Sequence, residues 1–100
     1  MPIQTTNVYV TTGDAIEVTT QSQSLTILQG VVVQSDSENS VDLQSSNDQL
    51  LNFGILAAAD AGVFSEGTGP AFIQNESGAT ISGEDFGIYT QVSGDRITNN

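Results

Sequence analysis

The sequence predicts an all-β chain: a single-stranded parallel β-helix, or β-solenoid, of about four coils with three short strands in each. A phrase of similar residues recurs along the chain, and its apolar anchors Ile27, Leu51, Ile73 and Ile97 lie 24, 22 and 24 residues apart. Such a recurrence is typical of one supersecondary unit stacked on itself. Short Val, Ile and Leu runs broken by Gly, Asn, Asp and Ser favour strands and turns over helices.

Each coil of about 22 to 26 residues is predicted to contain three strands, which implies a triangular cross-section. The recurring motif around the apolar anchors supplies one strand. A second set alternates apolar and polar residues, so that one side chain points into the coil and the next to solvent. Its members are Ile16–Val18, Val41–Leu43, Val63–Phe64 and Ile88–Tyr89. A third set follows Gly or Gly-Ala, and its members are Val31–Val33, Ile55–Leu56 and Thr80–Ile81. We expect successive coils to pair in parallel.

The corners of the coil are predicted at three polar stretches, residues 35–40, 45–48 and 65–70, because Gly permits positive φ and Asn, Asp and Ser bond their own backbone. The segment Ile55–Ala61 is rich in Ala and could be helical. It is shorter than an isolated helix requires, and its place after Gly54 matches Val31 after Gly30. We therefore predict a strand there.

The chain is expected to form a single domain. Residues 1–14 are predicted to be an N-terminal cap or first strand, and residues 15–100 the solenoid coils. Val8–Val10 could begin the first coil and cover its edge. The last phrase stops at Asn100, short of the Gly that follows it elsewhere. We therefore expect the chain to be an N-terminal fragment of a longer protein.

The second half of the chain carries a family resemblance. It reads Ile73-Gln-Asn75-Glu-Ser-Gly78-Ala-Thr-Ile81-Ser-Gly83, then Gly87-Ile88 and Ile97-Thr-Asn99. This resembles the Ile-x-Asn-x-Gly-x-Ile-x-Gly repeat of autotransporter passengers and other large secreted, adhesin-like β-helical proteins, with one extra residue before Gly78. In earlier coils the asparagine is kept as Asn52 and replaced by Gln29. The resemblance implies a right-handed β-helix in an extracellular or cell-surface bacterial protein, and no particular ligand.

The charge of the chain limits its partners. Twelve carboxylates against the single Arg96 give a net charge of −11, which repels nucleic acids and anionic lipid surfaces. The absence of Cys excludes disulfides and thiolate metal sites. No apolar run approaches the roughly 20 residues needed to cross a bilayer. We expect a protein or carbohydrate surface as partner, or self-association through exposed solenoid ends, with no nucleic acid and no membrane insertion.

Few kinds of catalysis are open to this composition. Without His, Cys or Lys, neither a nucleophile–histidine triad nor a Schiff base can form. Glycoside hydrolysis needs two carboxylates, for which the candidates are Asp42, Glu66, Glu84 and Asp85. Carboxylates at turns could instead bind calcium, and the candidates for that site are Asp14, Asp36, Glu38, Glu84, Asp85 and Asp95. Neither an EF-hand nor a calcium β-roll motif is present, so we predict no resident metal or cofactor.

The function expected from the sequence is a non-catalytic structural or interaction module of a secreted or cell-surface repeat protein. The alternatives are the first coils of a carbohydrate-active β-helix enzyme and a self-assembling solenoid. Carboxylates paired in one cleft would favour the enzyme, and carboxylates spread over all corners the module. The six aromatic residues are expected to be core stacks and end covers.

Overall fold

The computed structural model describes residues 3–67, 69–91 and 94–99. The described residues contain strands, turns and bends and no helix. The strands are β1 (Ile3–Gln4), β2 (Val8–Val10), β3 (Ile16–Val18), β4 (Ser24–Ile27), β5 (Val32–Ser35), β6 (Val41–Leu43), β7 (Gln49–Asn52), β8 (Ile55–Ala58), β9 (Ala61–Ser65), β10 (Phe72–Asn75), β11 (Thr80–Gly83), β12 (Phe86–Thr90) and β13 (Arg96–Asn99). The Ala-rich segment after Gly54 is strand β8, as predicted.

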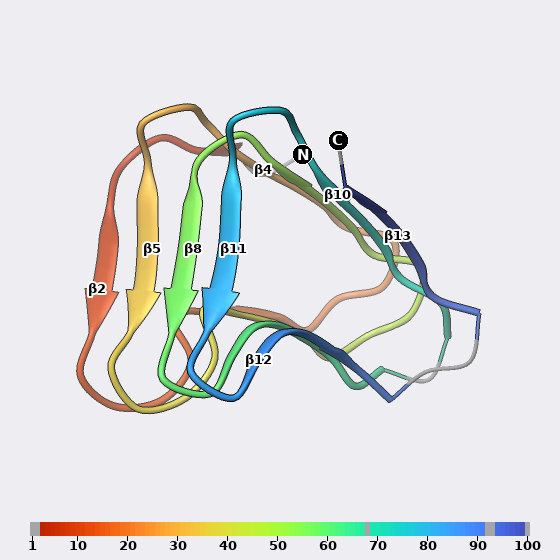
Figure 1. Cartoon of the computed structure of the whole chain (residues 1–100). Helices are drawn as coiled ribbons and strands as arrows, with labels where there is room; N and C mark the ends of the chain where they lie inside the picture. Colours follow the sequence, from red (N-terminus) through yellow and green to blue (C-terminus); the bar gives the residue numbers. More distant parts are fainter. Residues whose placement is uncertain (1–2, 68, 92–93, 100) are drawn as a thin grey trace.

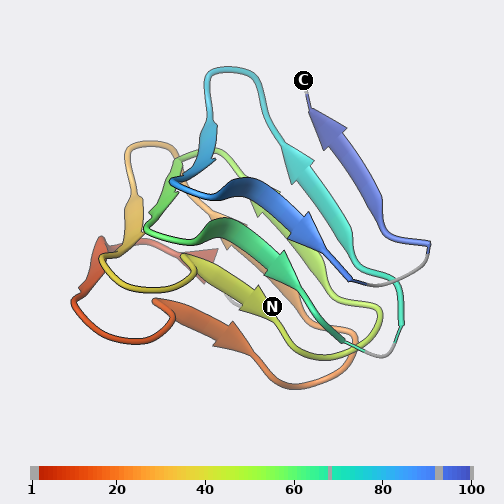
Figure 2. The same ribbon diagram turned by 60° about the horizontal axis from the view of Figure 1, so that its bottom comes forward.

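The strands form a parallel β-solenoid of about four coils, which confirms the predicted fold class. The first sheet has the order β1-β4-β7-β10-β13, the second β11-β8-β5-β2 and the third β12-β9-β6-β3. The strand pairings among the described residues are all parallel, because each strand meets the equivalent strand one coil later. Figure 1 shows β2, β5, β8 and β11 of the second sheet side by side, and Figure 2 shows the coils stacked from the N-terminal coil to β13. The handedness of the coil stays a prediction.

The register of the first sheet corrects the predicted anchors. Leu25 pairs with Leu50, Leu50 with Ile73, and Ile73 with Ile97, at spacings of 25, 23 and 24 residues. Leu51 is therefore one residue out of place, because it lies in the outward row with Thr26 and Gln74. Ile27 is two residues out of place. Ile27 pairs with Asn52. In the coil before Asn52, the position of the asparagine row is therefore occupied by Ile27, whereas the sequence predicted Gln29 there.

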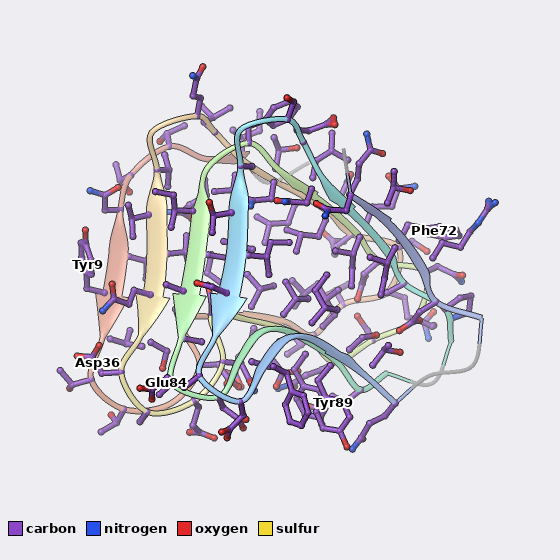
Figure 3. The ribbon with its side chains drawn as sticks, in the orientation of Figure 1. Tyr9, Asp36, Phe72, Glu84 and Tyr89 are labelled. Carbon is purple, nitrogen blue, oxygen red and sulfur yellow. The ribbon has the colours of Figure 1, made fainter. Side chains whose placement is uncertain are left out.

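The core is a narrow column of aliphatic side chains. Fully buried members from the three sheets include Leu50, Leu56 and Val63, with Ile27, Val33, Val41, Leu43 and Ile73 in the neighbouring coils. No aromatic residue belongs to this core. The prediction of aromatic core stacks is therefore wrong: Tyr9, Phe53, Phe86 and Tyr89 are exposed, and Phe64 and Phe72 are half-buried. Figure 3 shows Tyr9 and Tyr89 on the outside of the coil.

An asparagine ladder holds the corner between the first and second sheets. Nδ2 of Asn52 donates to Oδ1 of Asn75 (2.9 Å), and Nδ2 of Asn75 donates to Oδ1 of Asn99 (3.0 Å). Asn52 is fully buried. Beside it, a Cβ on Gly54 would lie 2.4 Å from the carbonyl oxygen of Val31, so only glycine lets the two coils approach this closely.

Within the segment predicted as a cap, the described residues 3–14 contribute strands to the solenoid. β1 pairs with β4, and β2 pairs with β5 with Val8 opposite Val33. Oδ1 of Asn7 also accepts a hydrogen bond from the backbone N–H of Val32 at 2.8 Å. Ile3–Gln4, and not Val8–Val10, thus begins the first coil, and Val8–Val10 is the first strand of the second sheet.

Candidate functional site

Three carboxylates gather on the outside of the third sheet near the N-terminal end. One group of three carboxylates among the described residues is spaced to hold a metal ion: oxygens of Asp14, Glu17 and Asp42 all lie within 4.8 Å of one another. Glu17 of β3 pairs with Asp42 of β6, and both face outward between the inward pairs of the same strands. Asp14 lies at the corner before β3. Stacking of two coils therefore builds the cluster.

Neutral donors fix the orientation of these carboxylates. Nε2 of Gln44 donates to Oδ2 of Asp42 (2.9 Å) and to Oε2 of Glu17 (3.0 Å). The backbone N–H of Asn39 donates to Oδ1 of Asp14 (3.0 Å). None of these donors carries a charge. The single Arg lies in β13, in another sheet. At an effective dielectric constant of 20, two ionised carboxylates repel by about 3.5 kcal/mol when their oxygens are 4.8 Å apart, the upper limit of the separations in this cluster.

Asp42 is the buried member of the cluster. Its side chain is only 3% exposed, and its Oδ1 atom is buried without a hydrogen-bond partner. The pKa of Asp42 is raised from 3.8 to about 8, chiefly by burial and also by the neighbouring carboxylates of Glu66 and Asp14, while the hydrogen bond from Gln44 acts to lower it. Because Glu66 and Asp14 accept hydrogen bonds when ionised, they bond to Asp42 only when it holds a proton.

An aromatic strip, made of Phe64, Phe86 and Tyr89, continues from the carboxylates along the same face. Asp42 pairs with Phe64 of β9, and Phe64 pairs with Tyr89 of β12. The rings of Phe64 and Tyr89 stack with centroids 5.2 Å apart, and those of Phe86 and Tyr89 lie 4.6 Å apart. One row on the third sheet thus changes from acidic near the N-terminal coil to aromatic near the C-terminal coil.

The six predicted calcium ligands lie at several corners of the coil. Asp14 belongs to the cluster, whereas Glu38 is exposed on the loop after β5. Asp36 accepts from Nε2 of Gln34 (2.9 Å), and Glu84 and Asp85 are exposed between β11 and β12. Figure 3 shows Asp36 and Glu84 at the same corner, one after β5 and the other after β11. Asp95 accepts from the backbone N–H of Ala71 (2.7 Å) and from Oγ1 of Thr90 (2.5 Å), which gives it a structural role.

Two of the four predicted glycosidase carboxylates interact with each other. Glu66 follows β9 and interacts with Asp42, whereas Glu84 and Asp85 lie at a different corner. Sequence reasoning missed Glu17 as a partner of Asp42. The signal was present, because Glu17 and Asp42 are the central residues of two strands that the sequence identifies as equivalent.

Both ends of the solenoid expose sheet edges around an open core. At the C-terminal end, Ile81, Ile88 and Ile97 help to line a hollow of about 620 Å³. Strand β13 is exposed throughout, and Ile97 is 46% exposed. At the N-terminal end, Ile16 and Leu25 help to line a hollow of about 270 Å³. Edge strands of this kind leave backbone N–H and C=O groups without a strand partner on one side.

No protein-family model, curated protein or solved structure matches the chain. The fold supports the parallel β-solenoid part of the resemblance to secreted β-helical repeats. Among the residues that the structure describes, no helix has the length and hydropathy needed to cross a bilayer.

Proposed function

We propose that this chain is a non-catalytic structural module that joins β-solenoid coils end to end, and that its partner is a second copy of the same chain. The observation that carries the proposal is the pair of sheet edges that the described residues leave unpaired at the two ends of the coil. The C-terminal end presents the edges of β11, β12 and β13, and the N-terminal end those of β1, β2 and β3, each around apolar core residues. Pairing the two ends would satisfy the edges and cover the core.

The two ends have matching residues in two of the sheets. In the second sheet, the row through Val8, Val33, Leu56 and Ile81 would continue from Ile81 of one copy to Val8 of the next. In the third sheet, the inward row would continue from Ile88 to Ile16. Each contact places two aliphatic side chains together, as within the coil itself. Such a head-to-tail contact can repeat along an axis.

The first sheet requires one rearrangement. It has five strands, whereas the other two have four, so two copies cannot stack closely while β13 of one and β1 of the next both keep their places. β1 spans two residues and β13 spans four. We therefore propose that β13 replaces β1 on β4 of the next copy, with Ile97 over Leu25.

The composition and the burial of Asp42 support a non-catalytic role. The whole chain lacks His, Cys and Lys. A general acid must reach its substrate, and Asp42 is 3% exposed beneath its neighbours. The resemblance to autotransporter passengers and adhesin-like proteins supports a further proposal, that the module acts outside the cell or on its surface.

Sedimentation velocity over a wide concentration range tests the assembly. We expect species larger than the 10.4 kDa monomer to accumulate with concentration, and more so at higher salt because the net charge of −11 is then screened. Replacing Ile97 with glutamate puts a charge into the contact between copies. This variant should sediment as a monomer at all concentrations. Its matched control is Ile55→Glu, since Ile55 is 42% exposed on the outer side of β8.

The control should assemble as the parent chain does. A parent chain that stays monomeric, or an Ile97→Glu variant that assembles as well as Ile55→Glu, would contradict the proposal.

A further inference from the structure

We propose that Asp14, Glu17 and Asp42 bind one calcium ion on the outside of the third sheet, and that this ion ties the first coil to the second. The ligands come from both coils, since Asp14 precedes β3 and Glu17 lies in it, whereas Asp42 lies in β6 of the next coil. This inference is independent of assembly at the solenoid ends.

The spacing of the oxygens fits calcium. Calcium binds oxygen ligands at about 2.3–2.6 Å, so two ligands of one ion lie at most about 5 Å apart. The three carboxylate oxygens lie within 4.8 Å of one another, inside that limit. Magnesium binds at about 2.0–2.1 Å and demands a near-ideal octahedron, which requires a closer set. Glu17 is exposed, which leaves a side of the site open to water ligands.

The buried Oδ1 atom of Asp42 is the second, independent observation. The side chain is 97% buried, yet no donor reaches Oδ1 of the ionised carboxylate, although buried carboxylate oxygens are nearly always hydrogen-bonded or bound to a cation. A neutral donor holds one oxygen of each carboxylate: Asn39 holds Asp14, and Gln44 holds Glu17 and Asp42. No Lys or His exists in the chain to supply a cation, and the single Arg lies in another sheet.

Calorimetric titration of the chain with calcium chloride, at a fixed ionic strength of about 0.15 M, tests the site. We expect one site with a dissociation constant of about 10⁻⁴ to 10⁻³ M, as in extracellular calcium modules, and at least about tenfold weaker binding of magnesium. Glu17→Gln should weaken calcium binding at least about tenfold. Because Glu17 is exposed, this variant keeps the fold.

Asp36→Asn is the matched control, since it removes the same charge from an exposed carboxylate at another corner. It should leave the affinity within about twofold. A second readout is the calcium-induced rise in melting temperature, which should be present in Asp36→Asn and lost in Glu17→Gln. Absence of calcium binding, or equal weakening by Asp36→Asn and Glu17→Gln, would overturn the proposal, because equal weakening indicates diffuse attraction to the acidic surface.

Discussion

Replacing Asn52 with alanine is expected to lower the free energy of unfolding by about 3 to 5 kcal/mol, a large part of the stability of a domain of this size. The fully buried Asn52 side chain donates from Nδ2 to Oδ1 of Asn75 (2.9 Å) and to the carbonyl oxygen of Thr80 (3.0 Å). Its Oδ1 accepts from the backbone N–H of Gly54 (3.0 Å). Alanine would leave these groups buried without partners and open a cavity. Urea denaturation measures the loss.

Asn99→Ala is the control for this prediction. Asn99 occupies the same row of the ladder, but it is exposed and accepts a single bond, from Nδ2 of Asn75 at 3.0 Å. Removing the Asn99 side chain should lower the free energy of unfolding by no more than about 1 kcal/mol. Equal destabilisation by the two variants would show that burial of the amide does not determine the contribution of the ladder.

The stability of the chain in metal-free buffer is expected to fall as the pH rises from about 4 to about 8. The pKa of Asp42 is 3.8 when unperturbed and about 8 in the fold. Between these values the folded state binds more protons than the unfolded state, so the free energy of unfolding decreases with pH and levels off above about 8. The contribution of Asp42 amounts to at most about 6 kcal/mol.

Asp42→Asn should remove this part of the pH dependence, because the amide stays neutral. The variant is expected to be more stable than the parent chain at pH 8 and above in the presence of chelator. Asp36→Asn removes an equal charge from an exposed corner and should keep the slope of the parent. Urea denaturation at a series of pH values measures it, and a parent-like slope in Asp42→Asn would contradict the account of the buried carboxyl.

The fold was predictable from the sequence because every coil repeats the same local pattern. Strands such as Ile16–Val18 and Val41–Leu43 show their inward residues by simple alternation. The register of the recurring motif was harder to predict, because Leu50 and Leu51 are both apolar. A shift of one residue exchanges the two faces of a strand. Asn52 decides the register, since its amide is buried in the corner, and hydrophobicity alone does not reveal that.

The position of the aromatic residues depends on tertiary geometry. Three sheets meet around a narrow column that Val, Leu and Ile fill, so aromatic rings lie on the outer rows instead. There the coils repeat at the strand spacing of about 4.8 Å, which lets Phe64 and Tyr89 stack at 5.2 Å. The burial of Asp42 has the same origin, because its neighbours on adjacent coils cover it. Sequence identified Asp14 and Asp42 as separate candidates, and only the stacked coils bring them together.

Disulfide cross-linking between copies tests the end-to-end contact most directly. The second-sheet row through Tyr9, Gln34, Ala57 and Ser82 predicts that Ser82 of one copy lies beside Tyr9 of the next, at a strand spacing that a disulfide can bridge. The chain has no cysteine, so Tyr9→Cys and Ser82→Cys each introduce a single thiol. Mixed under oxidising conditions, the two variants should form a mixed disulfide dimer, and each alone should form little. Equal cross-linking of Ser82→Cys with itself, or no mixed dimer at concentrations where the chain assembles, would contradict head-to-tail stacking.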